Sequence, residues 1–147
     1  MAGETLRIIG FIKRRPDLTP EQFYEHWEKV HAPLVVPWIL KHGFTSYMQI
    51  HATKALRNKL SSSIDFDGAG SFEIRDYDQF LAALSDPYYR NVIAKDELNF
   101  IDRKTTEVWP RSMGIQKNFV VDGKATIDTS QGSALLEEWD ERGRKGT

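Results

Sequence analysis

Histidines are the residues of this 147-residue chain best suited to transfer protons near neutral pH, and its four histidines fall between residues 26 and 51. An unperturbed histidine titrates near ~6.5, so its surroundings decide whether it is charged. His31 follows Trp27 by four residues and Phe23 by eight, on the apolar stripe of a predicted helix and just before Pro33. An isolated histidine there is usually satisfied by a backbone carbonyl, but here large apolar residues crowd the same place. We therefore predict that His31 is an acid–base group in an apolar pocket.

The other three histidines receive different interpretations. His51 ends a predicted strand in phase with Tyr47 and Gln49. These side chains line the pocket if that face is turned inward and belong to a dimer surface if it is turned outward, and the pattern leaves both open. His26 is expected on a solvated flank of its helix, and His42 near a helix C-terminus, where its charge suits the dipole.

A metal site is not expected. The chain has no cysteine, which excludes disulfides, thiolate zinc sites and a cysteine nucleophile. His26 and His31 are five residues apart, a spacing that places them on different faces of an α-helix. The run Gly68–Ser71 leads into a strand rather than a helix N-terminus, so it predicts no phosphate-binding loop.

A second group of candidates is aromatic and acidic. Asp86 and Asp96 are first of all expected as helix caps. Tyr88, Tyr89 and Phe100 make the same helical layer rich in stacking surfaces and phenolic donors, which suits a flat aromatic ligand. We predict His31, His51, Asp96 and Tyr88 as catalytic residues, and as substrate-binding residues Tyr24, Trp27, Trp38, Tyr47, Phe100, Lys54 and Arg57.

The order of elements predicts the fold class. Thr19, followed by Pro20 and Gln22, indicates a helix start, and Pro33 is expected to interrupt that helix. Strands are predicted at residues 6–12, 44–52, 68–74 and 105–109, and helices after residues 19, 33, 76 and 86, the last continuing to 102. This is a ferredoxin-like βαββαβ domain of the α+β class with an antiparallel sheet. Because the first strand is apolar at both parities, we expect a second copy of the chain to cover the open face, giving a homodimer of the dimeric α/β-barrel type.

Two segments fall outside this pattern. The connection 53–66 is long for a strand-to-strand link, and we predict a lid whose Lys54 and Arg57 meet a substrate carboxylate. Near the end, a hairpin turn is expected at Val121–Lys124 and an amphipathic stretch at Ala134–Arg142, before disordered residues from 143 onward. Residues 1–125 are assigned to the main domain and 126–147 to a C-terminal extension.

Composition excludes several function classes. The 20 basic and 21 acidic residues nearly cancel, so neither nucleic acid nor an anionic membrane is an expected partner. No apolar run approaches the ~20 residues of a membrane span, and the N-terminus lacks the features of a secretion signal. We expect a soluble cytoplasmic protein.

The runs Phe11–Phe23 and His26–Leu34 (His-Trp-Glu-Lys-Val-His-Ala-Pro-Leu) resemble the signature of the EthD-domain family. Asp86–Tyr89 and Asp96–Asp102 are similar to the family's fungal branch, which includes atrochrysone carboxylic acid decarboxylases and related dehydratases or cyclases of aromatic polyketide pathways. The resemblance implies a dimeric α+β barrel without bound metal or flavin, with His31 as a catalytic residue. This chain departs from many relatives by having glycine and serine, rather than an acidic residue, early in the third strand.

The leading hypothesis is a cofactor-independent lyase that removes carbon dioxide or water from a small aromatic polyketide or phenolic carboxylic acid in secondary metabolism. A cyclase, an isomerase or a cofactor-free oxygenase would use the same pocket for another reaction. A carrier or heme-binding barrel is the alternative from a different class.

Overall fold

The structure is a computed structural model that describes residues 3–104 and 111–146. Its contacts divide the chain into two compact units, Met1–Gln116 and Lys117–Thr147. The domain boundary proposed at residue 125 stays a prediction. The first unit contains, in chain order, β1 (Thr5–Ile12), α1 (Pro20–His26), η1 (Trp27–His31), α2 (Ala32–Lys41), β2 (Ser46–His51), α3 (Lys54–Arg57), β3 (Gly68–Ile74), α4 (Tyr77–Leu84), η2 (Tyr89–Ile93), α5 (Ala94–Glu97) and β4 (Ser112–Gln116).

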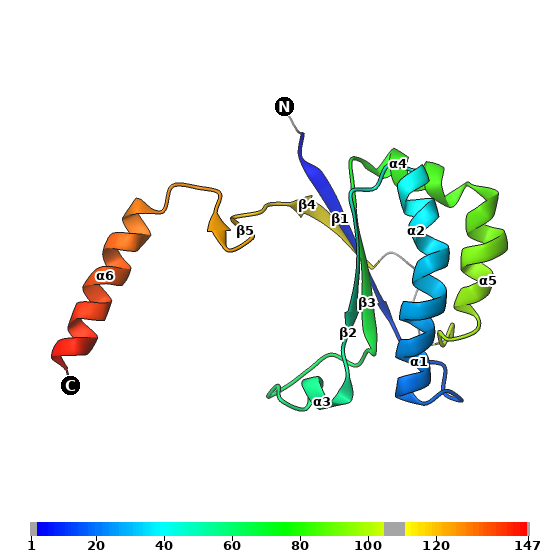
Figure 1. Ribbon diagram of the computed structural model, residues 1–147, viewed down its shortest axis with the longest axis horizontal. Helices are drawn as coiled ribbons and strands as arrows, with labels where there is room; N and C mark the ends of the chain where they lie inside the picture. The colour runs from blue at the N-terminus through cyan, green and yellow to red at the C-terminus, as the bar shows by residue number, and fades with distance from the viewer. Residues whose placement is uncertain (1–2, 105–110, 147) are drawn as a thin grey trace. The chain divides into compact units, whose positions relative to one another are not determined.

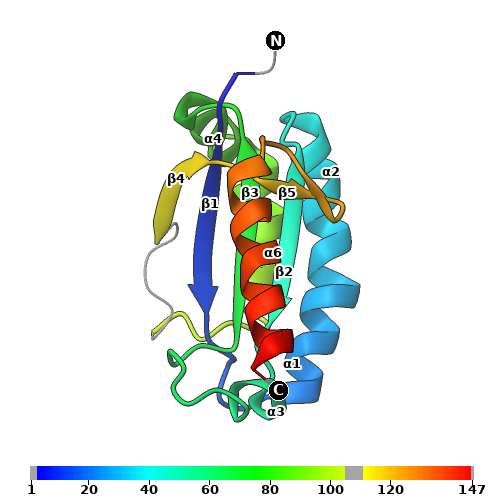
Figure 2. The same cartoon turned by 90° about the vertical axis from the view of Figure 1, so that its left-hand side faces the viewer.

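The sheet of the first unit has the strand order β2-β3-β1-β4, with every neighbouring pair antiparallel (Figures 1 and 2). This order, with helical connections after β1 and β3, is the ferredoxin-like arrangement. The predicted α+β class is therefore confirmed. The strand predicted at residues 105–109 lies outside the described residues, and the fourth strand that the structure describes is β4.

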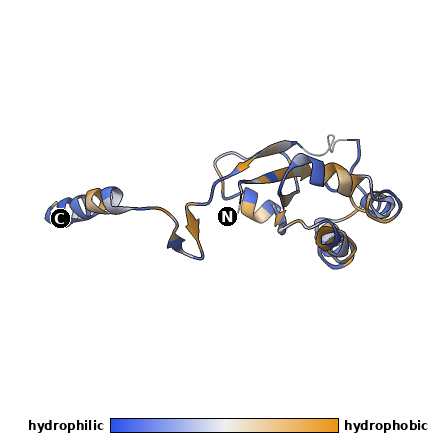
Figure 3. Cartoon of the chain, turned by 90° about the horizontal axis from the view of Figure 1, so that it is seen from above, coloured by the Kyte–Doolittle hydropathy of each residue, from blue (hydrophilic) through white to orange (hydrophobic). Residues whose placement is uncertain are grey.

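The helices α1, α2, α4 and α5 cover one face of the sheet, whereas α3 lies beyond its end (Figure 1). The view from above shows both hydrophobic and hydrophilic residues on the helices (Figure 3). The side chains that point toward the helices come from strand positions that lie opposite each other. For example, Ile8 of β1 pairs with Phe72 of β3. They pack with Trp38 and Phe80 in one hydrophobic core. Amphipathic helices on one face leave the other face of the sheet uncovered within this unit.

The first helix begins as the sequence predicts. The Thr19 side chain accepts a hydrogen bond from the backbone of Gln22, and the Gln22 side chain accepts one from the backbone of Thr19, which is a capping box. The expected break at Pro33 was wrong. Proline has no backbone N–H, but the first turn of a helix does not use that donor. Pro33 therefore fits the first turn of α2, and the helical chain runs through it.

Two π-helical segments interrupt the regular helices. In η1 the backbone N–H of Ala32 donates to the carbonyl of Trp27, and in η2 that of Ala94 donates to the carbonyl of Tyr89. Both are five-residue turns, one residue wider than an α-turn. Such turns change which side chains share a face, and this decides the geometry of the site below.

The inward phase of β2 is now defined. Tyr47, Gln49 and His51 are partly buried on the helix side of the sheet, whereas Met48 and Ile50 are 43% and 47% exposed on the open side. The dimer-surface alternative for the first three residues is excluded by this register.

The second unit contains β5 (Val120–Val121), β6 (Lys124–Ala125) and α6 (Ser130–Lys145). The predicted hairpin is confirmed, since Asp122 and Gly123 at its turn have φ angles of 51° and 74°. The helix α6 includes the predicted amphipathic stretch, but it extends to Lys145, so the expectation of disorder was wrong for residues 143–145. Among the described residues no helix is long and apolar enough to cross a membrane.

Candidate active site

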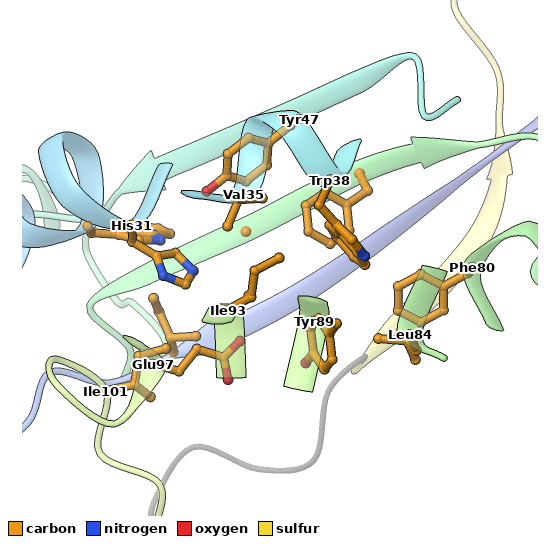
Figure 4. Close-up of a pocket in the computed structure, with 14 residues that line it drawn as sticks. His31, Val35, Trp38, Tyr47, Phe80, Leu84, Tyr89, Ile93, Glu97 and Ile101 are labelled. Carbon is orange, nitrogen blue, oxygen red and sulfur yellow. The ribbon is translucent and has the colours of Figure 1, made fainter. Parts of the chain in front are cut away.

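A cavity lies between the helices and the sheet of the first unit (Figure 4). It contains about 540 Å³ of space not filled by atoms, a volume that includes open solvent at its mouth. Most of its wall is apolar. The lining residues are Ile12, Trp27, His31, Val35, Trp38, Tyr47, Gly70, Phe72, Phe80, Leu84, Tyr89, Ile93, Glu97 and Ile101.

His31 is the titratable base of this cavity. It ends η1, and its side chain is 6% exposed. Its Nδ1 atom lies 2.9 Å from Oδ2 of Asp96, a carboxylate on α5 that is 8% exposed. Because a carboxylate only accepts hydrogen bonds, this contact assigns the proton to Nδ1 and leaves Nε2 for the cavity.

Three side chains hold the Asp96 carboxylate in place. Besides His31, Nε2 of His26 lies 3.0 Å from Oδ1, and Nδ2 of Asn99 donates to the same oxygen over 3.2 Å. His26 was predicted to lie on a solvated flank of its helix. This prediction was wrong, because His26 belongs to the hydrogen-bond network of Asp96. Asp96 is also not an N-cap, because it lies inside α5.

The π-turn η1 explains why both histidines reach one carboxylate. On an α-helix, residues five apart point about 140° away from each other. The i→i+5 hydrogen bonding of η1 widens the turn, so His26 and His31 meet on the same side. The argument from spacing that separated these two residues was wrong for this reason. Among the residues that the structure describes, no group of three or more histidine, cysteine or carboxylate side chains is arranged to hold a metal ion.

The surroundings of Asp96 and His31 shift the pKa values of both groups. Burial raises the pKa of Asp96, but the hydrogen bonds from His31, Asn99 and His26 outweigh it, and the net pKa lies below the usual range. Burial lowers the pKa of His31 more than the contact with Asp96 raises it. Near neutral pH this combination is a carboxylate beside a neutral imidazole, whose Nε2 lone pair can accept a proton.

A second polar group of the cavity is the phenol of Tyr47. Its oxygen accepts a hydrogen bond of 2.8 Å from Nε2 of Gln49, which also donates to the carbonyl of Trp27. Burial raises the pKa of Tyr47 to about 12. The hydroxyl proton is thus retained and is free to be donated to a ligand oxygen.

His51 supports this arrangement from outside the cavity. Its Nε2 lies 2.8 Å from Oε1 of Gln49, and its ring stacks on Trp27 at 4.8 Å and on Tyr24 at 5.0 Å. Tyr24 in turn donates to the carbonyl of Asp67. Of the predicted residues, Trp27, His31, Trp38 and Tyr47 line the cavity, whereas His51 packs on Trp27 and Tyr24 packs on His51.

The remaining predicted residues lie elsewhere. Tyr88 is not among the lining residues, because its hydroxyl donates to the carbonyl of Leu34. Phe100 is fully buried and packs against the ring of His31. Lys54 and Arg57 belong to α3, beyond the lining residues, and Arg57 donates to the carbonyl of Ala52. Their contact with a substrate, and the closing of 53–66 as a lid, stay predictions.

Glu97 was not named as a site candidate, and Tyr89 was named only as part of an aromatic layer, yet both line the cavity. A signal was present, since Tyr89, Ile93, Glu97 and Ile101 recur every four residues and all line the cavity. A glutamate in such a row of apolar residues indicates a carboxyl group on the side of the helix that faces the sheet. The helix expected to continue to residue 102 in fact ends at Glu97.

Comparison with known proteins identifies the family of this chain. The model of the EthD domain matches residues 15–104. Dehydratase aurZ of Gibberella zeae is 32% identical over 119 residues, which cover 76% of each chain. Decarboxylase nsrE of Aspergillus novofumigatus is 30% identical over 128 residues, which cover 82% of each chain. A crystal structure of an EthD-family protein from Bacillus halodurans has a TM-score of 0.49 and 15% identity, covering 79% of this chain and 99% of that one. The chain belongs to the EthD domain family.

Proposed function

We propose that this protein is a lyase that works without a cofactor, removing water or carbon dioxide from a flat phenolic substrate of the aromatic polyketide class. The observation that carries the proposal is the neutral imidazole of His31 on the wall of an apolar cavity, with Nδ1 bound to Asp96 and Nε2 left for a ligand. Membership in the EthD domain family supports it, since relatives are named dehydratases and decarboxylases.

The reaction needs proton transfer, which the cavity residues supply, and a place for electrons, which is a carbonyl group of the substrate. In dehydration, Nε2 of His31 takes a proton from the carbon beside a carbonyl, a double bond forms, and the hydroxyl group leaves as water once it is protonated. In decarboxylation, the bond to the carboxyl carbon breaks, the electrons move to the carbonyl, and a proton returns to the carbon. In both cases Tyr47 donates a hydrogen bond to the carbonyl oxygen as negative charge develops there.

Asp96 acts through His31. It fixes the tautomer that leaves Nε2 unprotonated, and it stabilises the imidazolium that forms after proton transfer. The apolar walls, including Trp27, Trp38 and Phe72, exclude water and offer flat surfaces to a ring. General acid–base help of this kind contributes about 10²–10⁴-fold in rate.

The test is turnover of a panel of anthrone and anthraquinone precursors, with and without a carboxyl group, in the absence of added metal. Mass spectrometry distinguishes loss of water from loss of carbon dioxide. His31→Ala is expected to lose activity about 10²-fold or more. The matched control is His42→Ala, because His42 also binds a carboxylate, Oδ2 of Asp86 at 2.8 Å, but is not a lining residue. Full activity of the His31 variant, or consumption of dioxygen by the wild type, would contradict the proposal.

The open face of the sheet supports a homodimer as part of the proposal. Ile9 and Met48 both lie opposite Ser71, and Phe11 and Ile50 both lie opposite Ala69, so these apolar side chains share one face. Contiguous exposed apolar surface of this kind is typical of an interface. A second copy presenting the same face would cover it by two-fold symmetry.

Sedimentation analysis tests the dimer. Ile50→Lys is expected to weaken it, since a lysine would be buried in the interface without a partner. Leu56→Lys is the control, because Leu56 is similarly exposed, at 56%, but lies on α3 rather than on the sheet. A monomeric wild type, or equal effects of the two substitutions, would contradict this assignment.

A further inference from the structure

Glu97 is the one acidic side chain among the described residues that line the cavity. It is the last residue of α5, and its side chain is 15% exposed. Figure 4 shows its carboxyl group beside Ile93 and turned toward the side of Tyr89. Glu97 and the base His31 therefore line the same cavity from different elements.

Only one oxygen of Glu97 is engaged. Oε2 accepts a hydrogen bond of 2.6 Å from Nη1 of Arg103, whose side chain is 52% exposed and therefore well hydrated. No hydrogen bond reaches Oε1 from the part of the chain that the structure describes. A half-paired carboxyl group in an apolar wall either holds a proton or awaits a polar ligand.

The groups around Glu97 favour the protonated form. Burial has the largest effect, Arg103 opposes it, Asp96 adds to it, and together they raise the pKa of Glu97 to about 7. The other titratable groups that line the cavity are His31 on η1, Tyr47 on β2 and Tyr89 on η2. Burial and the charge of Glu97 also raise the pKa of Tyr89 to about 12, so both phenols stay neutral.

We propose that Glu97 is a second acid–base residue of the site, which protonates a leaving hydroxyl group while His31 takes a proton from carbon. This inference rests on the proposed lyase function and narrows it to loss of water. The proton moves from carbon to Nε2 of His31, the carbon–oxygen bond breaks, a carbon–carbon double bond forms, and the proton of Glu97 leaves with the hydroxyl as water. A proton then returns from His31 to Glu97 through solvent.

The lining also indicates the substrate class. Among the described lining residues none is lysine or arginine, so a carboxylate would enter an apolar cavity without a fixed cation and beside Glu97. A neutral substrate avoids that cost. We infer a β-hydroxy ketone within or beside a phenolic ring, with its carbonyl at Tyr47 and its hydroxyl at Glu97.

The experiment compares Glu97→Gln and Glu97→Asp with wild type, using neutral and carboxylated anthrone precursors across pH. Glu97→Gln is expected to lower kcat for water loss by about 10²–10³-fold and to abolish the fall in activity above about pH 7. Glu97→Asp keeps a carboxyl group. We therefore expect this variant to retain the fall in activity at high pH and to lose less kcat than Glu97→Gln. The control is Glu73→Gln, a partly buried glutamate that also pairs with an arginine, Arg7 at 3.5 Å, but lies outside the lining.

Each outcome has one meaning. Wild-type kcat and an unchanged pH profile in a folded Glu97→Gln variant, together with an inactive His31→Ala, would overturn this inference and leave the lyase function standing. No turnover by the wild type, or full activity of His31→Ala, would overturn the function itself. A substrate-free check uses carboxyl carbon-13 NMR of selectively labelled protein: a Glu97 signal that titrates near the usual ~4.3 would overturn the inference with or without turnover. Release of carbon dioxide instead of water would also overturn it.

Discussion

Asp96 and Glu97 are neighbours in the chain, yet the two sides of α5 give their carboxyl groups opposite properties. Asp96 receives hydrogen bonds from three side chains and has a lowered pKa. Glu97 sits in an apolar wall with a single exposed arginine as its partner, and its pKa rises to about 7. Neighbouring carboxyl groups whose environments drive their pKa values apart can serve as a fixed anion and a proton donor in one site.

The largest expected effect comes from removing the negative charge of Asp96. Asp96→Asn would allow the wrong tautomer of His31, and we expect kcat to fall by about 10²–10⁴-fold. Asp86→Asn is the matched control, because Asp86 also binds a histidine, His42, but that histidine does not line the cavity. Steady-state kinetics of both variants decides the matter. Equal losses in the two would mean that the aspartate–histidine contact is structural in both places.

The two carboxyl groups should respond oppositely to pH. Asp96 has a lowered pKa, so its contribution to stability is present above about pH 4 and is lost as the pH falls further. Glu97 has a raised pKa, so the folded state loses stability as the pH rises from about 4.5 to 7. The cost is on the order of 2–3 kcal/mol.

Urea unfolding of wild type and Glu97→Gln between pH 4.5 and 8 measures this difference. The glutamine variant should gain stability relative to wild type as the pH rises, since glutamine does not ionise. A constant difference over that range would show that Glu97 ionises normally, and the contrast between the two carboxyl groups would disappear.

A substitution at Gly70 tests whether the substrate binds in the cavity. A Cβ atom at Gly70 would meet no heavy atom within 4 Å, so a side chain there would enter the free space of the cavity. Gly70→Leu is expected to lower kcat/KM about 10–100-fold, while thermal unfolding stays near that of wild type. Gly70→Ala should have a small effect, and unchanged kinetics of the leucine variant would place the substrate elsewhere.

The smallest effect is expected for the outer support of Asp96. His26→Ala removes one of three donors and should lower stability by about 1 kcal/mol, with a modest loss of activity. Asn99→Ala removes the other outer donor and provides the comparison. A loss in His26→Ala as large as in Asp96→Asn would mean that His26, rather than His31, carries the chemistry.

Local sequence signals predicted most of this fold. The capping box at Thr19 depends on residues close together in the chain, and the structure agrees with it. The phase of the second strand was left open by the sequence, and the structure turns Tyr47 toward the helices. Pro33 does not break the helix, because the first turn of a helix accepts proline, and this position cannot be told from a helix break by the residue type alone.

The site was only partly predictable, because side-chain direction depends on the exact helical turn. His31 was found from its apolar stripe, but the partnership of His26 and Asp96 requires a π-turn, which local patterns do not announce. Glu97 was overlooked although it shares a four-residue spacing with Tyr89 and Ile93. A spacing of four suits the wider turns that the structure contains.

The π-turns also bear on how such a site can be gained or lost. Each contains one residue more than the α-turn it replaces, so each can be viewed as a single-residue insertion absorbed by an existing helix. Deleting one residue from η1 would restore a regular helix and leave α1 and α2 able to cover the sheet, while His26 and His31 would no longer meet on Asp96. We expect such a deletion variant to keep its helical circular dichroism and lose turnover. In a scaffold of this kind, one codon separates a reactive protein from an inert one of the same shape.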